Sequence, residues 1–271
     1  MSATRPPAFA AIVATLVLAG CGSDATSSDD IAPSASATDA TADTAAEDES
    51  AQPVIDPGDG GDYSPVIDPT DFSDVVDNPF MPLLPGSRSV YEERTADGEV
   101  EEIAVEVLDE RRTVMGVSTI VVHDVASLDG EVIEDTYDWF AQDSAGNVWY
   151  FGEDTTSYDD DGTASTEGAW EAGVGGALPG IAMPAEPEVT GVGYRQEYLA
   201  GEAEDMGEVI AVTGSVSTPF GEFDDVIVTR DWTPLEPDAI EEKTYARGVG
   251  LVAETKNDGE TVMLVEFTPS T

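Results

Sequence analysis

The sequence predicts an all-β protein, an antiparallel open barrel or sandwich of about 10–12 strands that follows a disordered N-terminal tether. Two observations support this fold class. Short runs rich in Val, Ile, Tyr and Phe alternate with turn signals such as Asp97-Gly98 and Asp129-Gly130. No stretch has a convincing amphipathic helical pattern, and Leu199–Met206 is the only short helical candidate.

The predicted β-domain covers residues 78–271 and opens with an extended apolar segment, Asn78–Gly86, that should pack against it. Its expected strands are, in chain order, Ser87–Thr95, Val100–Asp109, Gly116–Ser127, Val132–Gln142, Asn147–Glu153, Gly168–Glu171, Gly193–Leu199, Gly207–Ser217, Glu222–Thr233, Ile240–Arg247, Gly250–Lys256 and Thr261–Phe267.

The stretch Asp135–Asp154 predicts an aromatic hairpin at the centre of the domain. It holds two of the four tryptophans and has a five-residue turn around Gly146. Both of its strands carry aromatic rings on both faces, whereas a half-buried strand is apolar on one face. We therefore expect either core packing on both sides or an aromatic wall of a ligand site. The candidate ligand-binding rings are Trp139, Tyr150 and Trp170.

The segment Ala172–Ala185 has no acidic residue in a chain rich in them. Its glycines and prolines rule out a regular helix. The segment is interpreted as an apolar loop that plugs the open end of the β-structure, either as static core or as a lid over a ligand. Its candidate binding side chains are Val174, Leu178, Ile181 and Met183.

Composition excludes several classes of function. The chain has 57 acidic residues, 10 basic residues and a net charge of −47, which argues against nucleic acid or anionic lipid as a partner of the folded surface. One cysteine allows no intrachain disulfide, and one histidine nearly excludes a multi-histidine metal site. We expect no cofactor.

No motif identifies catalytic residues, although the sequence leaves catalysis open. His123 lies within a strand, and no G-x-S-x-G elbow is present to supply a serine nucleophile. Paired carboxylates occur by chance among so many acids. Asp159 and Asp161 are weak calcium candidates, because Ser157 and Gly168 occupy two positions where a calcium loop needs acidic ligands.

The N-terminus carries a targeting pattern. Arg5 precedes an apolar run, Ala8–Ala19, which is too short to cross a bilayer and ends in Leu18-Ala19-Gly20-Cys21. This pattern resembles the bacterial lipoprotein signal. The resemblance implies a signal peptide over residues 1–20, acylation of Cys21, and attachment to a membrane of the bacterial cell envelope on its extracytoplasmic side.

Residues 21–77 read as an acidic, disordered tether. The span 22–78 has fifteen acidic residues and no Lys or Arg, so it buries too little apolar surface to offset its ordering entropy. The sequence PVIDP occurs twice, at Pro53–Pro57 and Pro65–Pro69, which suggests a duplicated spacer.

The C-terminal third contains TPFGEF, TYARGVGLV and a final strand–turn–strand. These motifs resemble the closing strands of uncharacterised bacterial extracytoplasmic β-domains of half-barrel type. They are carried here by Thr218, Pro219, Gly221, Phe223, Tyr245, Ala246 and Gly248–Val252. The resemblance covers roughly the last fifth of the chain and implies no catalytic residues.

These observations predict a lipid-anchored extracytoplasmic binding or interaction module without catalytic activity, whose ligand or protein partner the sequence does not identify. One alternative is a carrier that holds an apolar or lipid ligand in a half-barrel cavity. A further alternative is a carboxylate-based hydrolase of extracellular polymer. The sequence gives no oligomeric state.

Overall fold

The structure is a computed structural model that describes residues 63–96, 98–159 and 161–271. The predicted signal peptide, Cys21 and most of the predicted tether lie outside these residues. The described chain is all-β apart from one short 3-10 helix, η1 (Pro69–Asp71), in agreement with the predicted fold class. Within the described residues, no helical segment has the length and apolarity that crossing a membrane requires.

Eighteen strands are formed among the described residues, and most of them overlap the predicted segments, although several extend beyond the predicted bounds. They are β1 (Phe72–Ser73), β2 (Arg88–Arg94), β3 (Val100–Val114), β4 (Val117–Leu128), β5 (Glu131–Asp143), β6 (Val148–Tyr158), β7 (Ala164–Ser165), β8 (Trp170–Glu171), β9 (Leu178–Met183), β10 (Tyr194–Arg195), β11 (Glu197–Tyr198), β12 (Met206–Ala211), β13 (Val216–Ser217), β14 (Glu222–Phe223), β15 (Val226–Thr233), β16 (Glu236–Ala246), β17 (Gly250–Lys256) and β18 (Thr261–Thr268).

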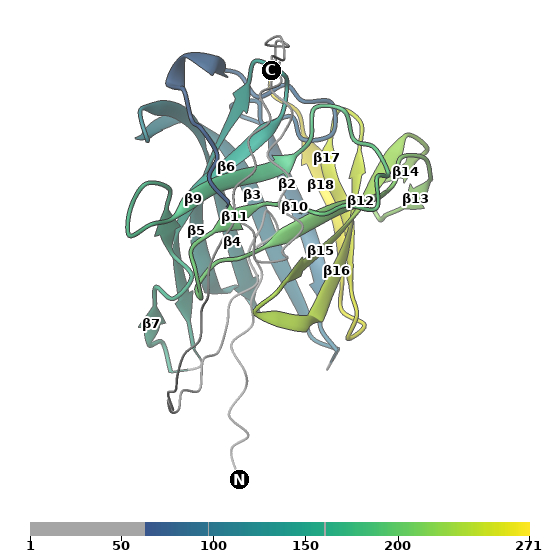
Figure 1. The fold of residues 1–271 in the computed structure, drawn as a ribbon. Helices are drawn as coiled ribbons and strands as arrows, with labels where there is room; N and C mark the ends of the chain where they lie inside the picture. Colours follow the sequence, from purple (N-terminus) through teal and green to yellow (C-terminus); the bar gives the residue numbers. More distant parts are fainter. Residues whose placement is uncertain (1–62, 97, 160) are drawn as a thin grey trace, which may run out of the picture. The chain divides into compact units, whose positions relative to one another are not determined.

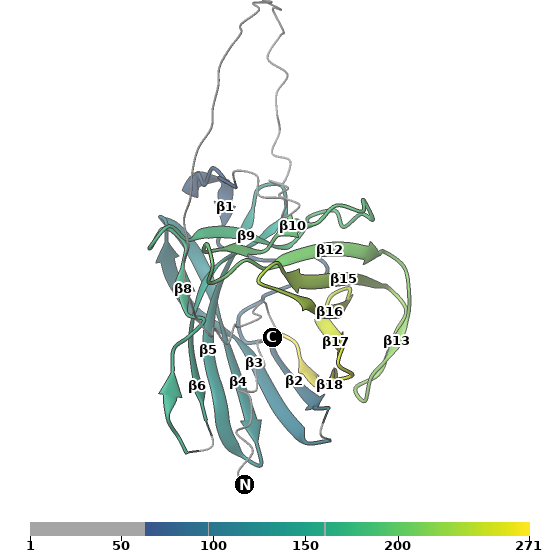
Figure 2. The ribbon, with the colours of Figure 1, turned by 60° about the horizontal axis from the view of Figure 1, so that its bottom comes forward.

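Sixteen of these strands form one antiparallel sheet, and β13 and β14 form a separate small hairpin. The sheet runs in the order β10-β12-β15-β16-β17-β18-β2-β3-β4-β5-β6-β9-β11, and Figures 1 and 2 show it curling around an interior. Its two end strands are separated in sequence by a single residue, Gln196. The sheet therefore closes on itself through one short stretch of chain, as a barrel.

A glycine permits this closure. Residues 194–198, which comprise β10, Gln196 and β11, pair with β12 through β10 and with β9 through β11. A Cβ atom on Gly180 of β9 would lie 2.3 Å from the Gln196 carbonyl, so a larger residue would force the strands apart. The Gln196 amide donates to the Asp205 carbonyl at 2.8 Å. Closure removes long free edges, which would otherwise invite pairing with other chains.

The aromatic hairpin forms as predicted from β5 and β6, with the turn closed by the Asp143 amide donating to the Asn147 carbonyl at 3.0 Å. Apart from Tyr137, which is exposed, the rings of Asp135–Asp154 are buried on both faces. On one side, the Phe72 ring lies edge-on to Trp149 at 6.2 Å and to Phe151 at 5.4 Å. The two-sided apolar pattern of this hairpin therefore marks core packing.

Three stretches differ from the sequence-based expectation. Tyr63–Asp77, expected as the end of a disordered tether, packs against the sheet: Val76 is fully buried and the Tyr63 hydroxyl donates to the Pro179 carbonyl at 2.7 Å. Leu199–Met206 forms turns and no helix, with the Leu199 and Ala203 backbones bridged. Leu178–Met183, expected within an irregular loop, is strand β9, because β6 and β11 pair with its backbone on both sides.

Candidate functional site

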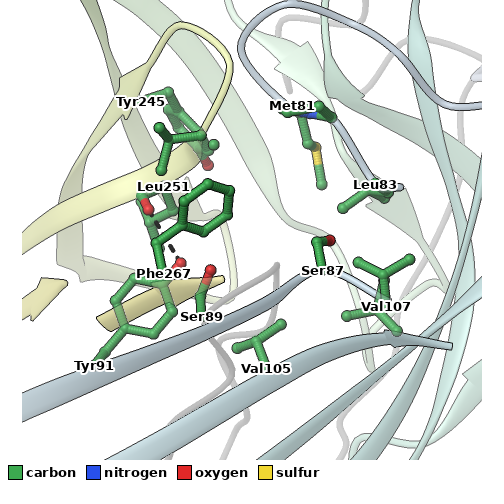
Figure 3. A pocket seen from close by; sticks show the side chains of 14 residues that line it. Met81, Leu83, Ser87, Ser89, Tyr91, Val105, Val107, Tyr245, Leu251 and Phe267 are labelled. Atoms are coloured by element: carbon green, nitrogen blue, oxygen red, sulfur yellow. Dashed lines mark hydrogen bonds between the residues drawn. The ribbon is translucent and has the colours of Figure 1, made fainter. Parts of the chain in front are cut away.

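A cavity of about 60 Å³ lies at one end of the barrel, between the segment before β2 and the strands β2, β3, β4, β16, β17 and β18. We call it the mouth cavity. Figure 3 shows Met81 and Leu83 facing Leu251 and Phe267 across it. Its lining residues are Met81, Pro82, Leu83, Ser87, Ser89, Tyr91, Val105, Val107, Val122, Tyr245, Val249, Gly250, Leu251 and Phe267.

The Asn78–Gly86 segment, which the sequence predicts to be extended, apolar and packed against the domain, forms one wall of the mouth cavity. It is fixed by backbone hydrogen bonds from Leu83 to the Val76 carbonyl at 3.0 Å and from Gly86 to the Val107 carbonyl at 2.8 Å. The Arg247 guanidinium lies 4.4 Å from the centre of the Phe80 ring. These contacts hold the wall in place, so the cavity is part of the folded state.

The polar groups of the mouth cavity are neutral. The Tyr91 hydroxyl donates to the Leu251 carbonyl at 3.0 Å, and the Ser87 hydroxyl donates to the Leu84 carbonyl at 2.8 Å. Burial, and in smaller part the nearby Asp124 carboxylate, raises the pKa of Tyr91, which stays protonated. The lining has no Asp, Glu, His, Lys or Arg. Such a surface suits an apolar group and offers no pair of groups for acid–base catalysis.

Further inside, the barrel is strongly polar. Among the described residues, ten acidic side chains are buried, against two buried basic ones, Arg195 and Lys243, so the acids cannot all be matched by protein cations. Successive side chains of a strand point to opposite faces of the sheet. In β5, Tyr137 is exposed on the outer face, and the buried Glu134 and Asp138 are on the other, inner face. The ten are Glu93, Glu101, Asp124, Glu134, Asp138, Glu153, Glu197, Asp205, Asp231 and Glu254.

Both lysines of the chain lie within this polar interior, on the neighbouring strands β16 and β17. The Lys243 ammonium is 3.2 Å from an Asp231 oxygen and 3.1 Å from a Glu241 oxygen. The Lys256 ammonium is 2.6 Å from a Glu93 oxygen. Burial disfavours the charged form of each lysine, but the surrounding carboxylates outweigh it and raise both pKa values, so both lysines stay charged.

The excess of buried acids is accommodated by protonation. Burial raises the pKa of Glu134 to about 7 and that of Asp138 to about 7, and it raises the pKa of Glu254 to about 8. For Glu134 and Glu254, the carboxylates of Asp138 and Glu241, respectively, act in the same direction. Part of the interior is therefore neutral near pH 7 and gains charge as the pH rises.

The three rings proposed as a ligand wall fall into two places. Tyr150 stacks on Phe140 at 4.8 Å and meets Trp170 edge-on at 5.3 Å, and its hydroxyl donates to Asp138 at 2.7 Å. Trp139 is instead covered by the Arg112 guanidinium, 3.9 Å from its ring centre. The structure joins Tyr150 with Trp170 but not with Trp139, and all three are core side chains outside the lining of the mouth cavity.

The four apolar side chains proposed from Ala172–Ala185 also lie away from the mouth cavity. Ile181 and Met183 are buried in β9, Leu178 is partly buried at the start of that strand, and Val174 is 60% exposed in the preceding turn. The strand residues of this set are part of the barrel wall, which corrects the expectation that the whole segment is an irregular loop. The Asn78–Gly86 segment could be predicted from the sequence to pack against the domain, but most of the other lining residues could not be recognised because they come from six separate strands.

The remaining polar candidates have local partners. His123 Nε2 is 2.9 Å from an Asp135 oxygen. Asp159 and Asp161 form an exposed turn in which both carboxylates accept from the Thr163 amide, and hydrogen bonds, first that of the Thr163 hydroxyl, lower the pKa of Asp161. Among the residues that the structure describes, no three His, Cys, Asp or Glu side chains are grouped to hold a metal ion.

No protein-family model and no curated protein matches the sequence. Among solved structures, the chain is similar to a candidate exported protein with a YmcC-like fold from Bacteroides fragilis, at a TM-score of 0.42 and 16% identity, covering 70% of this chain and 99% of that one. It is also similar to a candidate lipoprotein from Parabacteroides distasonis, at a TM-score of 0.38 and 14% identity, covering 72% and 100%. At TM-scores this low, the similarities carry no inference about function.

Proposed function

We propose that this chain is a lipid-anchored, extracytoplasmic binding module, and that its mouth cavity receives an apolar group of a ligand or partner. The observation that carries the proposal is the mouth cavity itself, an apolar hollow at the end of a closed barrel whose wall is held by hydrogen bonds. The lipoprotein-like pattern ending at Cys21 supports the anchored, extracytoplasmic setting.

The size of the cavity limits what can enter. Sites for whole small-molecule ligands have volumes of about 300–1,000 Å³, whereas the mouth cavity has about 60 Å³. One water needs roughly 10–15 Å³ measured in the same way. The cavity therefore accommodates a short alkyl chain or a single apolar side chain, and a complete lipid would require the wall around Met81 to move. This favours a binding module over a lipid carrier.

The charge of the surroundings further limits the ligand. The lining offers no cation to pair with an anionic head group. The nearby Asp124 carboxylate contributes to the raised pKa of Tyr91, which lines the cavity. A fatty acid carboxylate would meet an unfavourable potential there. A neutral ligand, which can hydrogen-bond to a hydroxyl such as that of Ser89, fits the lining.

The hydrolase alternative finds less support. A carboxylate-based hydrolase needs an acid pair that faces substrate in an open cleft. The lining of the mouth cavity has no carboxylate, and the ten buried acids are inside the barrel wall.

A pair of variants on strand β3 tests the proposal. Val105 lines the cavity, whereas Val100 on the same strand is 41% exposed on the opposite face. Val105→Phe fills the hollow, and Val100→Phe adds the same ring to the surface. Saturation-transfer NMR with n-butanol, n-hexanol and n-octanol should detect binding to the wild type and to Val100→Phe, with loss in Val105→Phe. Equal signals from all three proteins would contradict the proposal.

A further inference from the structure

A row of side chains crosses the outer face of the sheet. Glu106 of β3 is directly opposite His123 of β4, which is opposite Tyr137 of β5, which is opposite Asp154 of β6. Residues opposite each other on antiparallel strands have side chains on the same face, with Cβ atoms about 4.5–5.5 Å apart. The four side chains therefore form one continuous line on the surface of the barrel.

Two rings in this row are stacked. The His123 and Tyr137 rings are 4.2 Å apart between centroids and inclined by 8°. The Asp135 carboxylate holds the imidazole through the 2.9 Å contact with Nε2. One face of the Tyr137 ring is thus covered by His123, and the opposite face is directed toward β6. Tyr137 is 38% exposed, unlike the buried rings of the same hairpin.

The free face of this ring lies in a negative field. Asp154 is exposed on the β6 side, and Glu106 is exposed beyond His123. Although burial is its largest cause, the rise in the pKa of Tyr137 has further contributions from the carboxylates of Asp135, Glu110 and Asp154. The face of an aromatic ring attracts cations by its own quadrupole, and the carboxylates add to this attraction.

We propose that the space between the Tyr137 ring and the Asp154 carboxylate binds the ammonium or guanidinium group of a lysine or arginine from a basic protein partner. The ring covers the alkyl and charged part of that side chain, and Asp154 accepts its hydrogen bonds. The net charge of −47 favours a basic partner and steers it toward the domain. This surface is separate from the mouth cavity, and its occupation does not depend on the proposed apolar ligand.

The test uses the full chain in a nonionic detergent, at low salt, with single-charge probes. N-acetyl-lysinamide is titrated while backbone amide shifts are recorded by NMR, and N-acetyl-norleucinamide serves as the uncharged probe of similar shape. The expected shifts concentrate around His123, Tyr137 and Asp154 with the lysine probe and are missing with norleucine. A monovalent probe avoids the general attraction between a polycation and an acidic protein.

Variants separate a built site from general acidity. Tyr137→Ala and Asp154→Asn should each weaken probe binding on the order of two- to fivefold, and Tyr137→Phe should retain it because the ring remains. Tyr158→Ala is the matched control, since Tyr158 is 37% exposed and is followed by an aspartate-rich turn. It should bind like the wild type.

Several results would overturn the proposal. They are shifts spread over the whole acidic surface, equal binding by Tyr137→Ala and the wild type, equal loss in Tyr158→Ala, and no shift at any probe concentration. Equal shifts with the uncharged probe or with N-acetylglucosamine would also overturn it, because they would indicate an apolar or carbohydrate partner. Tyr137 and Asp154 are exposed, so the variants should fold, and the dispersion of their amide spectra verifies this directly.

Discussion

The Tyr150 hydroxyl donates a 2.7 Å hydrogen bond to Asp138 inside the barrel, where both side chains are buried. The bond favours the ionised carboxyl group, whereas burial, the larger effect, raises its pKa to about 7. Tyr150→Phe removes the donor and keeps the ring. Above about pH 8 the variant should lose roughly 1–3 kcal/mol of unfolding free energy, because a buried carboxylate loses its partner.

At about pH 5 the same variant should lose less, since Asp138 is then protonated. Urea denaturation at the two pH values measures the difference. Tyr137→Phe, which removes an exposed hydroxyl from the same hairpin, serves as a control and should change stability by under about 0.5 kcal/mol. An equal loss for Tyr150→Phe at both pH values would show that the hydrogen bond does not act on an ionised Asp138.

The buried acids predict that stability falls as the pH rises. Glu134 and Glu254 have folded-state pKa values of about 7 and about 8, above the ordinary value of 4.5. At pH values between 4.5 and the folded-state pKa of each group, the folded chain keeps a proton that the unfolded chain has released. Their contribution to stability is therefore fully present below about pH 4.5 and is lost as the pH rises through about 7 to 8.

Denaturation curves from about pH 5 to pH 9 test this trend, and Glu134→Gln provides the comparison. The amide of the variant resembles the protonated acid and does not titrate. The total loss of unfolding free energy over this pH range should therefore be smaller in Glu134→Gln than in the wild type, by an amount on the order of 3 kcal/mol. A stability that rises over this range, or an unchanged slope in Glu134→Gln, would be inconsistent with protonated interior acids.

Trp139 should contribute strongly to stability as a core side chain. It is 4% exposed and covered by Arg112. Trp139→Ala should cost about 3–5 kcal/mol in chemical denaturation. Tyr137→Ala, two residues earlier on the same face, should cost under about 1 kcal/mol because Tyr137 is 38% exposed and lies outside the core. Comparable losses would mean that Trp139 is not packed as described.

Local patterns in the sequence predicted much of this fold. The hairpin turn around Gly146, the strands on either side and the Ile103, Val105 and Val107 face of β3 follow from alternation and turn chemistry. Strand β9 could not be predicted in this way. Its Pro179 and Gly180 are typical of loops, and their tolerance depends on pairing with β6 and β11, which is a long-range property of the closed sheet.

The polar interior was also beyond sequence reasoning. Glu134 and Asp138 lie on one face of β5, and Tyr137 and Trp139 lie on the other. Because aromatic rings occur on both faces of the hairpin, the sequence does not indicate which face is inside. The structure places the acids inside the barrel and Trp139 on the outer face, where Arg112 covers it. The mouth cavity escaped prediction for a related reason, since Met81 and Phe267 are far apart in sequence and meet only after closure.

The lipid anchor is a separate prediction from the sequence. Cys21→Ala should abolish acylation, because a thiol is required to form the thioether that the lipoprotein-like signal implies. Metabolic labelling with an alkyne fatty acid, followed by detection on a gel, measures this in the bacterial host. Label that persists in Cys21→Ala would contradict the assignment.

The proposed function requires that the mouth cavity is an apolar space within the folded barrel. Xenon occupies dry apolar cavities in protein crystals, so a crystal of the chain pressurised with xenon tests the claim directly. The predicted result is xenon density between Met81, Val107 and Leu251, which disappears in Val105→Phe and remains in Val100→Phe. A mouth without xenon, or with ordered water in its place, would contradict the claim.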